Sequence, residues 1–220
     1  MNTTYTAYTT DATQNYHYLF DYKKTAQSIA FFVNQTQKPL SLSKLSNLLY
    51  LTERTFLKQY ASTIIGDHFV LSSSAGLILQ QTYLLLESIF NNTYQNNHWD
   101  FYDEITKWTE INNNAAPIQS KNISNISNKL LQLSVADIKT LQAIWQQYGD
   151  YSDNELNQKI QDECPEYHYS QSQEDVYMVI PIEHILKTLG YSKDLAAIIK
   201  QELYEQAEII KSFKDNAILK

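Results

Sequence analysis

Residues 44–71 read KLSNLLYLTERTFLKQYASTIIGDHFVL, and this stretch decides the fold. Its first part repeats apolar residues at three- and four-residue spacings, as an amphipathic helix does when it buries one face. A glycine–acid step, Gly66-Asp67, follows and leads into the apolar run Phe69-Val70-Leu71. This second part is typical of a turn that enters a strand. The stretch therefore predicts a domain that combines a long helix with extended chain.

We expect Ser43 to cap the long helix, because a hydroxyl at the N-cap accepts a backbone N–H. The apolar stripe of this helix consists of Leu45, Leu48, Leu49, Thr52, Phe56 and Tyr60. The opposite side carries Lys44, Glu53 and Lys58. A stripe of this kind is typical of packing in a core rather than of cofactor binding.

Helical patterns also surround this stretch. One begins at Asp21 and closes at Gln37-Lys38-Pro39. After the predicted strand, a serine at 72, 73 or 74 is expected to cap a helix that runs through Ile89. Aromatic alternation after residue 91 is suited to short strands, and a polar loop follows it. Residues 91–129 are therefore interpreted as an insertion within one domain, with a linker between subdomains as the alternative.

The second half of the chain carries clearer helix signals. Ser134 with Asp137, and Ser152 with Glu155, have the spacing of a capping box, and Gly149 closes the first of these two helices. Pro181 is placed to start a helix that Gly190 stops, and Ser192 is placed to cap the last helix. Residues 1–20 are rich in Thr and Tyr without a sustained period, which indicates a loosely held N-terminal arm.

Composition agrees with a mainly helical chain. The 220 residues are 43% hydrophobic, which is enough for a sizeable core, and they include only 4 Gly and 4 Pro. We therefore predict an α+β fold that is mainly α-helical, a compact helical domain with a small β-sheet or hairpins.

The charge balance argues against a freestanding DNA reader. Seventeen Lys and Arg stand against 24 Asp and Glu, for a net charge of -7, and Arg54 is the single arginine. Nucleic-acid binders use basic stripes and bidentate arginines to hold phosphates and bases. We therefore predict no direct nucleic-acid binding by the isolated chain.

The acidic residues concentrate in one stretch, residues 150–183, where nine acids and one lysine give a net charge of -8. The acids are Asp150, Asp153, Glu155, Asp162, Glu163, Glu166, Glu174, Asp175 and Glu183. Such a field favours encounter with a cationic partner, and Asp162, Glu163 and Glu166 are the candidate partner-binding residues. The alternative is a solvated face that only keeps the protein soluble.

Signals for catalysis are absent. The chain has no GxSxG, HExxH, P-loop or GxGxxG motif. Cys164 and His168 have a spacing that suits a metal on one helical turn, but Pro165 breaks the helix between them. We therefore predict no catalytic residue, no metal and no cofactor.

The location of the protein is expected to be the cytoplasm. Its single cysteine, Cys164, fits a reducing compartment. No basic segment followed by an apolar core precedes Lys23, so no signal peptide is expected. The longest apolar runs, such as YLLLESIF, fall short of the ~20 residues that a membrane-spanning helix needs.

The order of several short motifs resembles the Panacea domain, the SocA-like family of bacterial antitoxin-type proteins. Lys44, Leu45, Leu48, Leu49 and Tyr50 follow the KLLY core of that family, Gly66-Asp67 its glycine–acid step, and Tyr83 a later tyrosine. Downstream, the matching positions are Leu133-Ser134, Trp145, Tyr148-Gly149, Ser152, Leu156 and Pro165-Glu166. Two positions depart from the pattern. Ala75-Gly76 replaces a Gly-Pro, and Asp162 or Glu163 stands where a histidine is usual.

The resemblance spans residues 21–192 and implies the domain organisation and the function. Residues 1–20 form the arm, 21–192 the Panacea domain with its insertion near 91–129, and 193–220 a C-terminal helix. The family implies a protein that binds and neutralises a co-encoded toxin in a bacterial or phage toxin–antitoxin system. The cognate toxin is then the expected partner, cationic if the acidic stretch binds it. A proteolytic adaptor that delivers the toxin to a AAA+ protease, and an unrecognised enzyme, are the alternatives.

Overall fold

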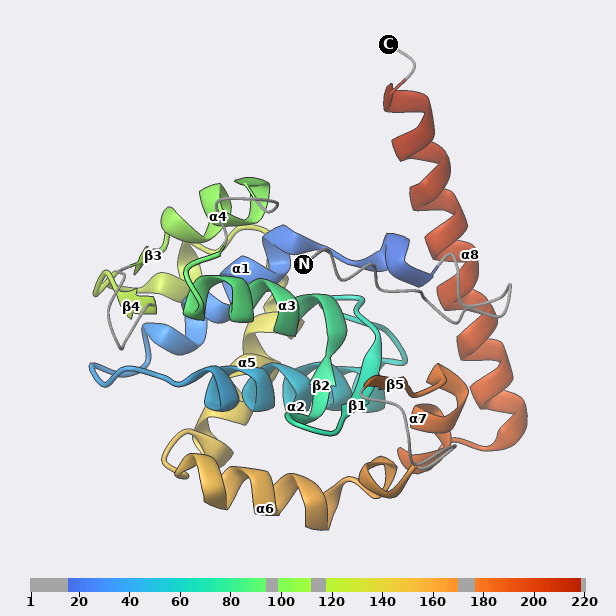
Figure 1. The fold of residues 1–220 in the computed structure, drawn as a ribbon. Helices are drawn as coiled ribbons and strands as arrows, with labels where there is room; N and C mark the ends of the chain where they lie inside the picture. The colour runs from blue at the N-terminus through green and yellow to red at the C-terminus, as the bar shows by residue number, and fades with distance from the viewer. Residues whose placement is uncertain (1–15, 94–98, 112–117, 170–176, 219–220) are drawn as a thin grey trace.

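The computed structural model describes residues 16–93, 99–111, 118–169 and 177–218. Helices make up most of this part of the chain, and two small antiparallel sheets accompany them, so the predicted fold class is confirmed. Helix α2 (Leu42–Tyr60) runs through the centre of the molecule (Figure 1). None of the described helices combines the length and the apolar character that a membrane span requires.

The start and the faces of α2 differ from the prediction. Ser41, not Ser43, is the N-cap, because Ser41 has the extended backbone that a cap requires and its hydroxyl accepts a hydrogen bond from the Lys44 N–H at 2.9 Å. The apolar stripe is buried except at Tyr60, which is 47% exposed. Lys44 and Glu53, on the side opposite the stripe, are buried as well. α2 is therefore enclosed on nearly every side.

Four helices surround α2. They are α1 (Tyr22–Val33), α3 (Gln80–Phe90), α5 (Val135–Tyr148) and α6 (Asp153–Glu163). Asp21 caps α1, since its carboxylate accepts the N–H groups of Lys23 and Lys24. Both predicted capping boxes, at the starts of α5 and α6, are present and confirmed. These local signals position the two helices that cover α2 from the second half of the chain.

The first sheet has three strands in the order β2-β1-β5. They are β1 (Phe69–Ser72), β2 (Gly76–Leu79) and β5 (Tyr177–Val179), with Val70 opposite both Ile78 and Val179. The strand predicted at 69–71 is confirmed. The helix cap predicted at Ser72, Ser73 or Ser74 is wrong, because these serines lie in the β1–β2 hairpin. There the Ser72 hydroxyl accepts the N–H groups of Ser74 and Ala75.

Residues 91–129 contain more helix than predicted. α4 (Trp99–Thr106) precedes the two-stranded sheet of β3 (Thr109–Ile111) and β4 (Ile118–Ser120), and the 3₁₀ turn η3 (Ile126–Asn128) follows. The aromatic alternation over 99–106 is therefore helical, because Phe101 and Ile105 fall on one face and bury it beside α1. Whether the segment is an insertion stays a prediction.

The remaining elements lie at one end of the molecule. They are the 3₁₀ turns η1 (Tyr16–Leu19) and η4 (Pro165–His168), and the helices α7 (Ile182–Thr188) and α8 (Lys193–Ile218). α8 packs on α7 and η1, and its C-terminal part projects beyond the body of the molecule (Figure 1). Tyr16 is buried, so the end of the predicted arm is packed, while residues 1–15 lie outside the described ranges.

Candidate functional site

The glycine–acid step is held by a buried carboxylate from α2. Glu53 Oε2 accepts the N–H groups of Ile64 and Ile65, each at 3.0 Å, and Oε1 accepts that of Gly66 at 2.8 Å. Gly66 has φ +73°, and a Cβ atom there would lie 2.4 Å from the carbonyl oxygen of Leu19. The step therefore requires glycine for two reasons, its backbone conformation and its close contact with the N-terminal segment.

Asp67 then performs the capping role that the sequence assigned to serines. Its carboxylate accepts the N–H groups of Gln81 at 3.1 Å and Thr82 at 2.7 Å, the Thr82 hydroxyl at 2.8 Å, and the N–H of His68 at 2.7 Å. Burial raises the pKa of Asp67 to about 6 and that of Glu53 to about 7, although the donated N–H bonds oppose this rise. Both acids fix the chain between α2 and α3.

The single arginine of the chain joins its two halves. Arg54 Nε donates to Glu166 Oε1 at 2.5 Å and Arg54 Nη2 donates to Oε2 at 3.3 Å, while the Tyr50 hydroxyl donates to Oε1 at 2.6 Å. Burial alone would raise the pKa of Glu166, but the bonds and charge of Arg54 lower it below its ordinary value. A charged, internally paired carboxylate is thus buried between α2 and η4.

Lys44 ties the start of α2 to the turn between α5 and α6. Its ammonium group donates to the carbonyl of Tyr148 at 2.9 Å and to the carbonyl of Tyr151. Burial lowers the pKa of Lys44. A cation suits this position, because the last carbonyls of a helix carry partial negative charge.

Several other motif positions also pack internally. Leu48 and Leu49 are fully buried, and the Trp145 ring packs on Phe32 with centroids 6.3 Å apart. The Gly149 N–H closes α5 on the carbonyl of Trp145 at 2.7 Å. These residues therefore help to build the core of the domain.

Cys164 is not an activated nucleophile. Its thiol is buried, and burial raises its pKa to about 12, so the thiolate is not populated near neutral pH. Within the described ranges, no three His, Cys, Asp or Glu side chains are grouped so that they could hold a metal ion.

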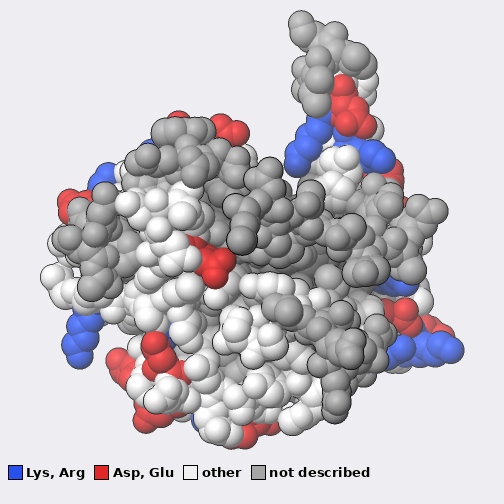
Figure 2. Space-filling view, in the orientation of Figure 1, with Lys and Arg blue, Asp and Glu red and all other residues white. Residues whose placement is uncertain are grey.

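The acidic stretch separates into different environments once it folds. Asp162 and Glu163 are exposed near the end of α6, but Glu166 is fully buried and does not belong to a partner-facing surface. Glu163 accepts hydrogen bonds from the Lys159 ammonium at 3.1 Å and from the Tyr148 hydroxyl at 3.0 Å. Figure 2 shows acidic side chains in separate groups on the visible face.

The remaining acids of the stretch are dispersed. Asp153 accepts a hydrogen bond from the Ser41 hydroxyl, Glu155 completes the α6 capping box, and Glu183 pairs with Lys187 and Lys200. Glu174 and Asp175 lie outside the described ranges. The part of the stretch that remains an exposed acidic surface, as predicted, is therefore the end of α6 with Asp162 and Glu163.

Sequence reasoning missed the roles of Glu53 and Arg54. Glu53 holds N–H groups that are 11 to 13 residues away, and Arg54 meets a carboxylate 112 residues away. The periodicity of the sequence within one helix gives no information about such long-range contacts. One signal was present for Arg54, because a unique arginine inside a buried helix calls for an acidic partner.

Comparison with protein families gives one finding. The family model described as "Antitoxin SocA-like, Panacea domain" matches residues 45–166. No curated protein and no solved structure matches the chain. The matched range begins in α2 and ends at Glu166, so it contains both partners of the Arg54–Glu166 ion pair.

Proposed function

Because the chain belongs to the antitoxin SocA-like, Panacea domain family, we propose that it neutralises a co-encoded protein toxin by binding it stoichiometrically in the cytoplasm. The observation that carries this proposal is the internal pairing of the motif side chains. Lys44, Asp67 and Glu166 are all buried and bound to groups of the same chain. This arrangement supports a rigid scaffold that acts through its surface.

The exposed end of α6 is the proposed contact with a cationic toxin. Asp162 and Glu163 lie in sequence close to the buried side chains of Cys164 and Glu166, so a firmly anchored backbone presents them. Negative charge on a surface accelerates encounter with a positive partner, and salt screens that effect. Glu166 is left out of this contact because it is buried.

The test of the proposal is co-expression with the product of the adjacent gene. Growth should be rescued when both proteins are made, and the two should co-purify as a complex. If the toxin disappears only in cells that hold an intact AAA+ protease, the chain is instead a delivery adaptor. If no complex forms and growth is not rescued, the antitoxin proposal fails.

The contribution of α6 needs a matched pair of variants. Asp162→Asn combined with Glu163→Gln should lower the association rate at low salt and have a smaller effect at high salt. The control is Glu202→Gln combined with Glu205→Gln, which removes the same charge from exposed positions of α8. Equal rates for the two double variants would return Asp162 and Glu163 to the role of solvated surface.

A further inference from the structure

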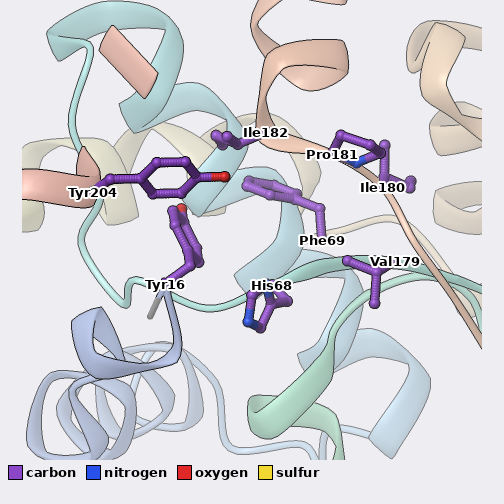
Figure 3. A pocket seen from close by; sticks show the side chains of 8 residues that line it. All are labelled: Tyr16, His68, Phe69, Val179, Ile180, Pro181, Ile182 and Tyr204. Carbon is purple, nitrogen blue, oxygen red and sulfur yellow. The ribbon is translucent and has the colours of Figure 1, made fainter. Parts of the chain in front are cut away.

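A small pocket lies where η1, β1, the β5–α7 connection and α8 meet (Figure 3). Its lining residues are Tyr16, His68, Phe69, Val179, Ile180, Pro181, Ile182 and Tyr204. The cavity volume is about 20 Å³, which accommodates one water-sized group. Two of the lining residues reach the surface: Val179 is 38% exposed, and Pro181 is exposed as well.

The polar groups of the pocket suit a hydrogen-bond donor. The Tyr16 side chain is 4% exposed, and its hydroxyl has no hydrogen-bond partner among the described residues. In Figure 3 the Tyr16 hydroxyl points toward the ring of Tyr204, and the Tyr204 hydroxyl points toward the ring of Phe69. Burial lowers the pKa of His68 to about 4, with a smaller effect from His17, so the His68 ring is neutral near pH 7.

The charges that act on these phenols favour a cation. Glu53 and Asp67 both act on Tyr16, after the larger effect of burial, and Glu183 acts on Tyr204. Lys200 lies beside the cluster, with its ammonium 5.6 Å from the centroid of the Tyr204 ring and 3.5 Å from Glu183. An ammonium group therefore already contacts this aromatic cluster from within the chain.

We propose that the pocket receives a lysine side chain of the toxin, an inference that rests on the proposed function. The methylene groups of that lysine lie against Val179, Pro181 and Ile182, and its ammonium donates to the hydroxyl of Tyr16. The faces of the aromatic rings stabilise the charge through their quadrupoles. A guanidinium group is too large for a cavity that holds one water-sized group, so the pocket selects lysine over arginine.

The test uses the isolated chain and a small probe. The probe is N-acetyl-lysine methylamide, and its neutral counterpart is N-acetyl-norleucine methylamide, which keeps the methylene groups and lacks the ammonium. NMR titrations would follow the methyl signals of Ile180 and Ile182, which line the pocket. We expect saturable shifts with the lysine probe and binding about five-fold weaker with norleucine. Equal binding of both probes, or no saturable shift with either, would overturn the proposal.

Two variants locate the contact. Tyr16→Phe keeps the ring and removes the hydroxyl, so it should reduce the preference for lysine, while Tyr22→Phe on α1 should leave it unchanged. An unchanged preference in Tyr16→Phe would contradict the assigned acceptor. If Tyr16→Phe does not fold, the comparison of the two probes on the wild-type chain still tests whether the pocket prefers an ammonium group. If the chain captures the toxin but binds both probes equally, only the proposal that the pocket binds a lysine is refuted. If the chain captures no toxin, the proposed function is refuted.

Discussion

The two longest helices, α2 and α8, are built for different tasks. Twelve of the 19 residues of α2 are buried, against four of the described side chains in the 26-residue α8. The inward positions of α2 include charged groups with internal partners. Those of α8 are only Ala196, Ile199, Leu203 and Ala207, while Ile209 and Phe213 on its projecting part are 56% and 71% exposed. α2 therefore forms the centre of the core, whereas much of the surface of α8 stays exposed at the edge of the molecule.

The family match follows the same division. It covers residues 45–166, which include nearly all of α2 and its partner Glu166, and it stops before α7 and α8. The scaffold is thus what the chain shares with its family. Tyr16 and Tyr204 of the pocket, and the projecting end of α8, lie outside the matched range. Specificity for a partner is best sought there and on the exposed end of α6.

The largest effect is expected from Glu166→Ala. It leaves the Arg54 guanidinium and the Tyr50 hydroxyl without their shared acceptor in the interior, so stability should fall by about 3–5 kcal/mol. Chemical denaturation measures the change. Asp162→Ala, on the nearby exposed end of α6, is the control and should stay within about 0.5 kcal/mol. Similar values for the two variants would refute the structural role of the ion pair.

The contrast between the helices is tested by one truncation in each. Leu48→Ala in α2 removes a fully buried side chain and should cost about 2–5 kcal/mol. Phe213→Ala in α8 removes a larger but exposed side chain and should change stability by less than about 0.5 kcal/mol. Denaturation midpoints of the two variants provide the comparison. A loss at Phe213 as large as that at Leu48 would mean that α8 is part of the core.

Gly66→Ala should destabilise by about 1–3 kcal/mol or more. The positive φ strains any side chain, and the added Cβ atom would collide with the Leu19 carbonyl. Gly190 also has a positive φ, +95°, but open space surrounds its Cβ position. Gly190→Ala is therefore the matched control, and thermal melts should show a smaller loss for it. A larger loss for Gly190→Ala than for Gly66→Ala would contradict the close contact between Gly66 and Leu19.

A further test of the comparison concerns the dependence of stability on pH. The pKa of Glu53 rises from 4.5 to about 7 on folding, so the folded chain holds that proton more tightly and the stabilising effect declines as pH rises through this interval. Asp67, raised from 3.8 to about 6, acts in the same direction. Between about pH 5 and about pH 8 the wild type should therefore lose more stability than Glu53→Gln does. A parallel dependence for both chains would contradict a titrating Glu53.

The local features of this fold, such as the helix caps, could be predicted from the sequence. The long-range features, such as the pairing of strands, could not. Ser134 with Asp137 shows its capping box within four residues, so the start of α5 could be placed. Ser72, by contrast, uses the same hydroxyl-to-N–H chemistry to close a hairpin as it would to cap a helix. Whether the serine closes a hairpin or caps a helix depends on the pairing of β1 with β2. The serine itself carries no information about that pairing.

The candidate partner-binding residues show the same limit. Asp162, Glu163 and Glu166 are equally acidic in the sequence, yet the third lies in the interior because Arg54 approaches it from α2. The pocket was beyond sequence reasoning altogether, since its walls come from residues 16, 68–69, 179–182 and 204. Only the fold brings these positions together.

The most direct test of the account is a titration of toxin activity with the purified chain. A protein that neutralises by binding should reduce the activity linearly, with a sharp end point at a fixed molar ratio when the toxin concentration is well above the dissociation constant. That end point should be the same after short and long incubation. Loss of activity at substoichiometric amounts that deepens with time would contradict the account, because it would mean that each molecule of this chain inactivates many toxin molecules in turn.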